Sequence, residues 1–290
     1  MKVLILGASG MLGYSLFCNL QKYKNLEVYG TVRNVSDYMS AFDGFRNKLI
    51  SEVDIADLSN IRKIVNEVIP DVVINCIGII KQHSNDENYH IDNIRVNALF
   101  PYEIAKICDE SSIRLIHFST DCVFSGEKGL YCELDTPDAY DVYGKTKNLG
   151  EVSYGKHLTL RTSIIGHELK NHVSLVDWFL SQKVSVKGFS NAVFSGFPTA
   201  YIAKILGDNI LNSELHGLYH LASSPIDKFQ LLNLIKSQYK KDIEIVDSSE
   251  LKIDRSLDAS KLNNKINVSI PNWSELVEFM HKDFEMRYQK

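Results

Sequence analysis

Short apolar runs alternate with longer segments of helical period along the first half of the chain. The apolar runs cover residues 2–6, 26–32, 72–75, 113–118 and 158–162, and helical segments end near residue 23 and span 61–68, 97–109 and 143–152. The run at 2–6 has no polar interior, which is typical of a parallel strand that helices cover on both faces. The alternation predicts consecutive βαβ units, as in a Rossmann-type doubly wound parallel sheet.

The regular alternation of strand-like and helical segments ends at about residue 163. Residues 174–180 and 199–211 have helical spacing, 185–195 favours loop or strand, and 217–221 is a strand-like run. We therefore expect an α/β fold with a nucleotide-binding Rossmann domain over 1–163 and a smaller α+β substrate-binding region over 164–290. Strand 217–221 is expected to rejoin the first sheet.

A glycine-rich turn follows the first predicted strand. Gly7, Gly10 and Gly13 form a G-x-x-G-x-x-G spacing that leads into the first helix. Glycines at this point let backbone N–H groups approach a diphosphate at the helix N-terminus. Such a turn can also be purely structural, but its position in the first βα unit favours a dinucleotide cofactor.

The residue type at the end of the second strand bears on the choice of cofactor. NAD sites usually place a carboxylate there, whereas NADP sites place a cation for the 2′-phosphate. Arg33 occupies this position, and Glu27 begins the strand instead of ending it. The pattern favours NADPH and leaves NADH open; the alternative for Arg33 is a solvated loop side chain.

Two tyrosine–lysine pairs have the spacing that puts both side chains on one helical face. They are Tyr143 with Lys147 and Tyr102 with Lys106. Only the first pair follows the predicted strand 113–118, whose carboxyl end leads into Thr120. Ligands of open α/β sheets bind at the carboxyl ends of the strands. We therefore expect Tyr143 and Lys147, with Thr120, to form the active site.

At this point the chain resembles the extended short-chain dehydrogenase/reductases, and among them the dTDP-4-dehydrorhamnose reductase group. The resemblance covers nearly the whole length and rests on the joint order of GASGMLG, PDVVINCIG, RVNA, HFSTDCVFSG, VYGKTKNLGE, LRTSIIG, SGFPT, GLYHLAS and RSLDASKL. Family members often carry an aromatic residue where this chain has Cys122, so the sugar accepted here can differ.

The resemblance implies three sets of site residues. The catalytic set is Thr120, Tyr143 and Lys147 with Asn97 in support. Cofactor contacts are expected from Tyr143 and Lys147 and from Gly7, Ser9, Gly10, Met11, Leu12, Gly13, Arg33, Asp57, Leu58, Cys76, Ile77 and Gly78. The substrate side is expected to include Asp121, Cys122, Pro198 and Arg255.

These residue types suit the reduction of a ketone. Negative charge develops on the carbonyl oxygen, which requires aligned hydrogen-bond donors and a proton source. Tyr143 can supply the proton, and the neighbouring Lys147 is expected to lower its pKa by stabilising the phenolate. Thr120 would donate to the same oxygen; the alternative for its hydroxyl is a cap at the strand end.

The implied activity is NADPH-dependent reduction of the 4-keto group of a nucleotide-linked 6-deoxyhexose in deoxysugar and polysaccharide precursor biosynthesis. The sugar could resemble dTDP-4-dehydrorhamnose or a UDP-2-acetamido-2,6-dideoxyhexulose. One alternative is an epimerase or dehydratase of the same superfamily, although dehydratases have an Asp-Glu pair where this chain has Asp121 and Cys122. Another alternative is a non-catalytic NAD(P)-binding regulatory subunit.

The composition limits the classes of partner that are expected for this protein. The 290 residues carry a formal charge of −4 without a run of basic residues, so neither nucleic acid nor an acidic membrane is expected as a partner. The five cysteines form no C-x-x-C pair, which supports neither a disulfide framework nor a metal site. Without a secretory signal or an apolar span, a cytoplasmic protein is expected, and a homodimer is left open.

Overall fold

The computed structural model of the chain describes residues 1–34, 36, 40–80, 88–170 and 173–288. The first half contains β1 (Lys2–Leu6), α1 (Met11–Leu20), β2 (Glu27–Thr31), η2 (Arg46–Lys48), β3 (Leu49–Ile50), α2 (Leu58–Val68), β4 (Val72–Asn75), α3 (Tyr89–Asn93), the π-helical turn η4 (Ile94–Leu99), α4 (Phe100–Glu110), β5 (Arg114–Thr120), η5 (Asp121–Val123), α5 (Val142–Leu149) and β6 (Leu158–Thr162).

The second half mixes short strands and helices. It contains β7 (Ile164–Ile165), α6 (Leu175–Ser181), β8 (Ser185–Phe189), β9 (Ala192–Phe194), β10 (Phe197–Pro198), α7 (Thr199–Ile205), the π-helical turn η6 (Leu206–Ile210), β11 (Gly217–His220), β12 (Ile226–Asp227), α8 (Lys228–Gln238), β13 (Glu244–Ser248), β14 (Ile253–Asp254), α9 (Ser260–Ile266) and α10 (Trp273–Arg287).

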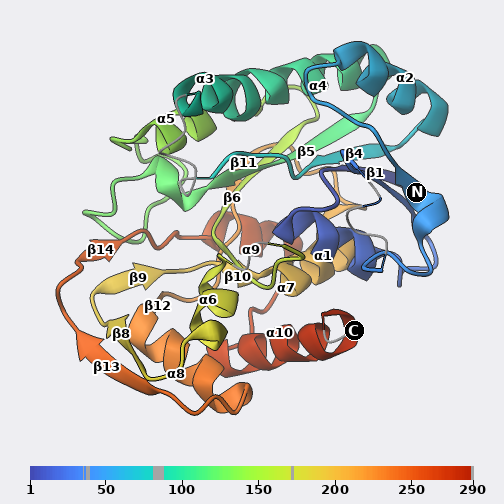
Figure 1. The fold of residues 1–290 in the computed structure, drawn as a ribbon. Coiled ribbons are helices and arrows are strands. Elements are labelled where there is room, and N and C mark those ends of the chain that lie inside the picture. Colours follow the sequence, from blue (N-terminus) through green and yellow to red (C-terminus); the bar gives the residue numbers. More distant parts are fainter. Residues whose placement is uncertain (35, 37–39, 81–87, 171–172, 289–290) are drawn as a thin grey trace.

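A parallel sheet forms the centre of the fold, as the apolar runs predict. Its seven strands have the order β11-β6-β5-β4-β1-β2-β3, and every neighbouring pair is parallel. Figure 1 shows α2, α4 and α5 over one face and α1 and α7 over the other. This doubly wound arrangement confirms the predicted Rossmann-type fold.

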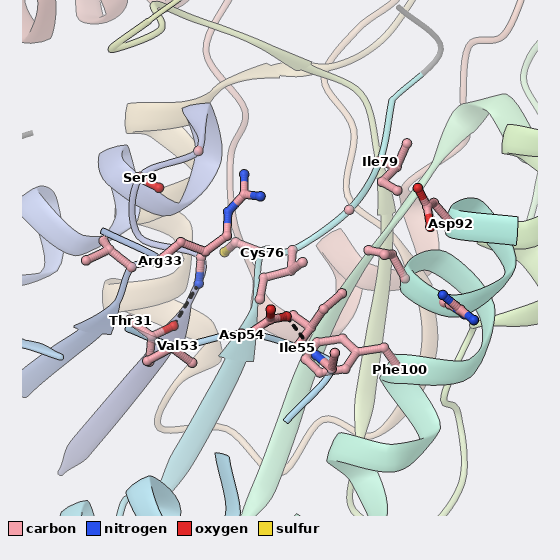
Figure 2. Close-up of a pocket in the computed structure, with 18 of the residues that line it drawn as sticks. Ser9, Thr31, Arg33, Val53, Asp54, Ile55, Cys76, Ile79, Asp92 and Phe100 are labelled. Atoms are coloured by element: carbon pink, nitrogen blue, oxygen red, sulfur yellow. Dashed lines mark hydrogen bonds between the residues drawn. The ribbon is translucent and has the colours of Figure 1, made fainter. Parts of the chain in front are cut away.

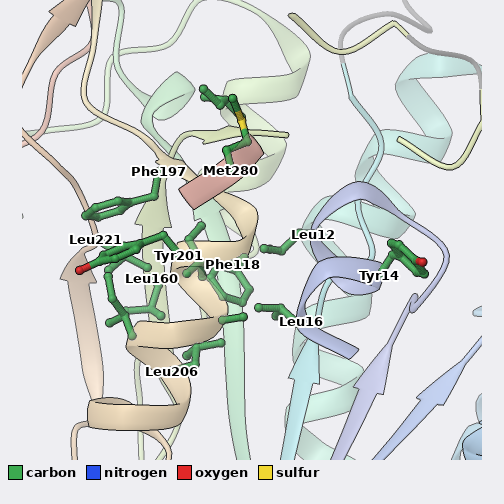
Figure 3. Close-up of a cluster of buried hydrophobic side chains, with 14 of the residues drawn as sticks. Leu12, Tyr14, Leu16, Phe118, Leu160, Phe197, Tyr201, Leu206, Leu221 and Met280 are labelled. Atoms are coloured by element: carbon green, nitrogen blue, oxygen red, sulfur yellow. The ribbon is translucent and has the colours of Figure 1, made fainter. Parts of the chain in front are cut away.

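Alternate residues of β1 enter two separate hydrophobic cores. Val3 and Ile5 pack on the face of α1 and α7, whereas Leu4 and Leu6 pack on the face of α2 and α4. Figure 3 shows part of the first core, where Leu12 and Leu16 of α1 approach Phe118 of β5. Because both faces are covered, β1 needs apolar residues at every position, and its run has no polar residue after Lys2.

The second half contributes one strand to the central sheet and builds a smaller region beside it. β11 pairs in parallel with β6, through Gly217 opposite Leu158 and His220 opposite Arg161. Three smaller sheets, β10-β7, β12-β9-β14 and β13-β8, lie with α6, α8 and α10 on the same side of the central sheet as α7 (Figure 1). This region flanks the carboxyl ends of β5 and β6, where ligands of open α/β sheets bind.

Candidate active site

The glycine turn after β1 has a backbone geometry that side chains would disrupt. Gly7 adopts a left-handed backbone angle of φ +83°, and a Cβ atom on Gly13 would lie 2.1 Å from the Gly7 carbonyl oxygen. Gly10 is the N-cap of α1, and its nearest contact for an added Cβ is an ordinary 3.6 Å. The turn therefore brings strand, loop and helix N-terminus close together and leaves open space in front of Gly10.

A cavity of about 910 Å³ lies in front of this turn. Figure 2 shows it between Ser9 and Arg33 on one side and Asp92 and Phe100 on the other. Its wall includes these predicted cofactor residues: Gly7, Ser9, Gly10, Met11, Arg33, Leu58, Cys76, Ile77 and Gly78. The volume and the glycine turn in the wall suit a dinucleotide whose diphosphate lies at the α1 N-terminus.

Five predicted cofactor residues do not line the cavity: Leu12, Gly13, Asp57, Tyr143 and Lys147. Leu12 is part of the buried core and Gly13 lies under the turn against Gly7. The Asp57 carboxylate caps α2, where it accepts hydrogen bonds from the Asn60 N–H at 3.0 Å and the Ser59 hydroxyl at 2.6 Å. Asp57 is therefore the N-cap of α2 in this structure.

Asp54 lies on the cavity wall instead, next to Ile55. Its carboxylate accepts a hydrogen bond from the Ala56 N–H at 2.9 Å. Asp54 and Asp57 are three positions apart in the sequence. Asp57 caps α2, and Asp54 lies at the cavity. The helix-capping pattern Asp57-x-x-Asn60 was the available signal.

Arg33 lies two residues beyond the end of β2 and is exposed. Figure 2 shows its guanidinium turned toward the cavity, between Ser9 and Cys76. Glu27, at the opposite end of the same strand, is engaged by the Lys48 ammonium at 2.8 Å and the Tyr29 hydroxyl at 2.7 Å. The charged side chain near the carboxyl end of β2, on the cavity wall, is therefore the cation Arg33.

Helix α5 carries Tyr143 and Lys147 on one face. Asp141 caps this helix by accepting from the Gly144 N–H at 2.7 Å. The Lys147 ammonium is buried and donates a 2.6 Å hydrogen bond to the Phe118 carbonyl oxygen of β5. Burial lowers the pKa of Lys147 to about 8, while the negative charge of Glu151 acts in the opposite direction.

Tyr143 meets the end of β5 at Thr120. Burial raises the pKa of Tyr143 above its ordinary value, and an interaction with the Thr120 hydroxyl opposes the rise. The expected lowering by Lys147 is not found, because desolvation has the largest effect on the pKa of Tyr143 and the lysine is directed to Phe118. The phenol therefore holds its proton at neutral pH, as a proton donor must.

Thr120 ends β5 and has its hydroxyl between two neighbours. Its Oγ1 donates to Asp121 Oδ1 at 3.0 Å and accepts from the Cys122 N–H at 3.1 Å. The hydroxyl thus caps the short helix η5, as the alternative interpretation of this residue proposed, and it also faces Tyr143. Capping and a role at the site are compatible because a hydroxyl both accepts and donates.

Asn97 belongs to the π-helical turn η4 and is completely buried. Its amide accepts from the Ile79 N–H at 3.0 Å and donates to the Ile79 carbonyl at 3.0 Å. A Cβ atom on Gly78 would lie 3.3 Å from Asn97 Oδ1 and 4.0 Å from the Lys147 ammonium. Asn97 thereby holds the segment after β4 at the place where the cavity approaches Lys147.

The predicted substrate residues are distributed around the end of β5. Asp121 and Cys122 follow Thr120 directly, and the Arg255 Nε donates to the Phe124 carbonyl at 2.9 Å. The positive charge of Arg255 also lowers the pKa of Asp121, against burial that raises it. Pro198 lies in β10, which pairs with β7 just after β6. These residues and the catalytic set therefore meet at one edge of the sheet.

Lys228 is a further cation near this edge that sequence reasoning did not find. Its positive charge lowers the pKa of Asp121, and burial lowers the pKa of Lys228 itself to about 8. A single lysine at the start of a helix has no recognisable pattern, so only the folded chain reveals it.

The second tyrosine–lysine pair lies elsewhere. Tyr102 is exposed on α4, stacks on Tyr154 and donates to the Glu151 carbonyl at 3.3 Å. Within the described residues, no group of three or more His, Cys, Asp or Glu side chains could hold a metal ion. In the same part of the chain, no helix is both long and apolar enough to cross a membrane.

The fold and this constellation define an extended short-chain dehydrogenase/reductase. The family model described as RmlD substrate binding domain matches residues 1–286, and the chain belongs to that family. The sequence-based resemblance is thereby confirmed.

Individual relatives agree with this assignment. A probable low-salt glycan biosynthesis reductase of Haloferax volcanii is 32% identical over 152 residues, which are 52% of this chain and 48% of that protein. The dTDP-4-dehydrorhamnose reductase of Escherichia coli K12 is 27% identical over 240 residues, 77% of this chain and 73% of the relative. Thus the match spans about half of the first relative and about three quarters of the second.

A solved structure shows the same fold over nearly the whole chain. The dTDP-4-dehydrorhamnose reductase of Bacillus anthracis, in complex with NADP, superposes with a TM-score of 0.79 at 20% identity and covers 97% of this chain and 99% of that chain.

Proposed function

We propose that this protein reduces the 4-keto group of a nucleotide-linked 6-deoxyhexose, with NADPH as the hydride donor, in deoxysugar or polysaccharide precursor biosynthesis. The observation that carries the proposal is the meeting of Thr120, Tyr143 and Lys147 beside a cavity that begins at a dinucleotide-type glycine turn. The E. coli and H. volcanii relatives are named as reductases of such substrates or of glycan biosynthesis, which supports the same class.

The residues of the cavity fit the proposed cofactor. A side chain at Gly13 would fill the turn, whereas the space in front of Gly10 is open. Arg33 lies on the cavity wall, where it would bind the 2′-phosphate. When bound, NADPH supplies a hydride to the keto carbon. Lys147, whose ammonium lies 4.0 Å from the position of a Cβ atom on Gly78 of the cavity wall, would hold the nicotinamide ribose.

Tyr143 and Thr120 would act on the carbonyl oxygen. The Tyr143 phenol is protonated and can transfer its proton as negative charge develops on that oxygen. Thr120 would turn its hydroxyl hydrogen from Asp121 to the same oxygen, and this bond strengthens as the charge grows. Lys147 would favour the transfer electrostatically once the site is filled, since a nearby cation stabilises the phenolate left behind.

The other side of the site would hold the substrate. We propose that Asp121, Cys122 and Pro198 surround the sugar and that Arg255 binds the diphosphate. Apart from the Nε bond to Phe124, the Arg255 fork makes no hydrogen bond within the described residues, so its other N–H groups can meet two phosphate oxygens in parallel. The division into residues 1–163 for the cofactor and 164–290 for the substrate, with β11 in the central sheet, follows from this assignment.

The direct test is incubation with NADPH deuterated at C4 and a panel of dTDP- and UDP-linked 4-keto-6-deoxy sugars. A reductase adds two hydrogens to one of them, and mass spectrometry finds the deuterium at C4 of the sugar. Loss of water would show a dehydratase, an unchanged mass with altered stereochemistry an epimerase, and cofactor binding without consumption a regulatory subunit. Any of these three results would overturn the proposal.

We also propose that the enzyme is a cytoplasmic homodimer. None of the five cysteines, all of which lie in the described part of the chain, forms a disulfide, and this suits a reducing compartment. Ile91, Ile94 and Leu149 are 52%, 54% and 63% exposed on α3, η4 and α5, which pack against one another. A second copy would cover these apolar side chains. Light scattering should give twice the chain mass, and Ile94→Asp should return it to one.

A further inference from the structure

Glu151 follows Lys147 by four residues, just past the end of α5, and its side chain is 8% exposed. One carboxylate oxygen accepts a 2.7 Å hydrogen bond from the Ser119 hydroxyl of β5. Arg161 of β6 donates to both oxygens, through Nε and Nη2, each at 2.7 Å. The Arg161 side chain is 3% exposed. A bidentate ion pair with this burial fixes the carboxylate in one geometry.

Arg161 is anchored in turn by the neighbouring strand β11. Its Nη1 lies 3.4 Å from His220 Nε2. Burial lowers the pKa of His220, and its Nδ1 is 3.0 Å from the Tyr131 carbonyl oxygen, so Nδ1 carries the hydrogen and Nε2 accepts from Arg161. Ser119, Arg161 and His220 occupy paired positions on β5, β6 and β11 and form one polar row across the sheet. Glu151 is therefore fastened to the sheet and not to its own helix alone.

Three consecutive residues of β5 contact residues at four-residue spacing on the α5 side. The pairs are Phe118 with Lys147, Ser119 with Glu151, and Thr120 with Tyr143. Ser119 is the middle residue, so its bond to Glu151 fixes the backbone on either side of it. One side is the carbonyl that accepts from Lys147, and the other is Thr120. A shift of Ser119 would therefore displace the lysine and the threonine together.

The carboxylate of Glu151 also bears on the charge of Lys147. Burial lowers the pKa of this lysine to about 8, and the negative charge of Glu151 opposes the shift. His117 and Cys76 also interact electrostatically with Lys147, and burial keeps both uncharged, because it lowers the pKa of His117 and raises that of the Cys76 thiol. The elements packed on α5 carry further ionisable side chains, which are Asp121 and Cys122 in η5, Tyr89, His90 and Asp92 in α3, Arg95 in η4 and Arg114 in β5. Among the carboxylates in the described part of the chain, it is Glu151 whose charge raises the pKa of Lys147.

We propose that Glu151 is a positioning residue for Lys147: its clamped carboxylate supplies the counter-charge for the ammonium and holds it at the end of β5. The inference rests on the proposed function, in which Lys147 binds the nicotinamide ribose. Glu151 is not part of the cavity wall, so it acts through the lysine and the strand. A buried ammonium needs a counter-charge. Because Ser119 and Arg161 fix the carboxylate, it stays in place when the lysine turns toward the cofactor.

The titration of Lys147 can be measured directly in the whole protein by nuclear magnetic resonance. Carbon-13-labelled lysine gives a Cε signal for each lysine, and the signal absent from Lys147→Met identifies this residue. Glu151→Gln should lower the midpoint of the Lys147 titration by about half a pH unit or more, because a negative charge is removed. The double variant Glu151→Gln/Arg161→Met removes both charges of the pair. Its midpoint should return toward that of the wild type, which loosened packing would not produce.

Binding of NADPH gives a second measurement. The Kd should begin to rise at a lower pH in Glu151→Gln than in the wild type, and the two proteins should bind equally well at about pH 6, where Lys147 is charged in both. A general disruption of the fold would instead weaken binding at every pH. Lys145, exposed on the same helix, is the internal control, since its midpoint should be the same in every variant. Glu110→Gln removes an exposed carboxylate that pairs with Arg62 and should match the wild type in both measurements.

Two results of the titration would overturn the inference: an unchanged Lys147 midpoint in Glu151→Gln, or a lowered midpoint that the double variant retains. If Glu151→Gln does not fold, Arg161→Met is compared with the double variant. The double variant should then have the lower midpoint, and equal midpoints would count against Glu151. The titration needs neither cofactor nor substrate, so a protein that binds no NADPH or reduces no ketone would refute the proposed function while the titration still decides the role of Glu151.

Discussion

The ammonium of Lys147 donates to the carbonyl oxygen of Phe118, two residues before the end of β5. This bond ties α5 to the strand that delivers Thr120, so the position of the catalytic lysine depends on the sheet and not on its helix alone. Glu151 strengthens the connection beyond the helix, because it accepts from the Ser119 hydroxyl and from Arg161, each at 2.7 Å.

Tyr143→Phe removes the proton donor and keeps the ring. The variant should fold and bind NADPH normally, while kcat falls by roughly 10² or more, the usual contribution of a positioned acid. Stopped-flow measurement of NADPH consumption gives the rate. Tyr102→Phe is the matched control, because that tyrosine lies on the outer face of α4 and should leave kcat unchanged. Full activity of Tyr143→Phe would refute the site assignment.

The lowered pKa of Lys147 predicts that NADPH binding weakens as the pH rises. Its pKa is about 8, so the ammonium is charged below that pH and neutral above it. Charged donors bond more strongly than neutral ones by about 1 kcal/mol, which is roughly fivefold in affinity. The Kd for NADPH should therefore rise as pH increases through 8. Fluorescence titration of Lys147→Met should give a weaker and pH-independent Kd over the same range.

Arg33→Ala tests the choice between the two cofactors. Removal of a cation that pairs with the 2′-phosphate should weaken NADPH binding by about 10- to 100-fold and leave NADH binding nearly unchanged. Isothermal titration with both cofactors measures the difference. Equal losses would return Arg33 to the role of a solvated loop residue.

Arg255→Leu should raise the KM for the nucleotide sugar and leave NADPH affinity unchanged, because its free N–H groups are proposed to meet the diphosphate. Inhibition by the free nucleoside diphosphate provides a second measurement that does not involve the sugar. An unchanged inhibition constant would place Arg255 outside the phosphate site.

Gly13→Ala tests the packing of the glycine turn. The new methyl group would lie 2.1 Å from the Gly7 carbonyl oxygen, whereas the corresponding distance for Gly10→Ala is 3.6 Å. Gly13→Ala should therefore lower the melting temperature by several degrees, and Gly10→Ala should leave it close to that of the wild type. Thermal unfolding followed by circular dichroism compares the two. A stable Gly13→Ala protein would contradict the close approach.

Features that depend on residues close together in the sequence could be predicted from the sequence alone. The run at 2–6 coincides with β1, because a strand covered on both faces needs apolar residues at successive positions. The strand-length segments at 72–75 and 158–162 coincide with β4 and β6. The position of Tyr143 and Lys147 after the strand that ends at Thr120 was equally evident from the order of elements. The boundaries of α3 and η4 could not be predicted from the sequence, because a π-helical turn has no distinct residue pattern.

The sequence by itself determined the parallel sheet, the glycine turn and the residues that end β5, because strand length, backbone freedom and helical spacing are local properties. Only the tertiary structure decided that Asp54 and not Asp57 lies on the cavity wall, and that Lys147 donates to the Phe118 carbonyl. Those relationships join segments that are far apart in the chain, and their energies depend on burial and charge that exist only after the layers have packed together.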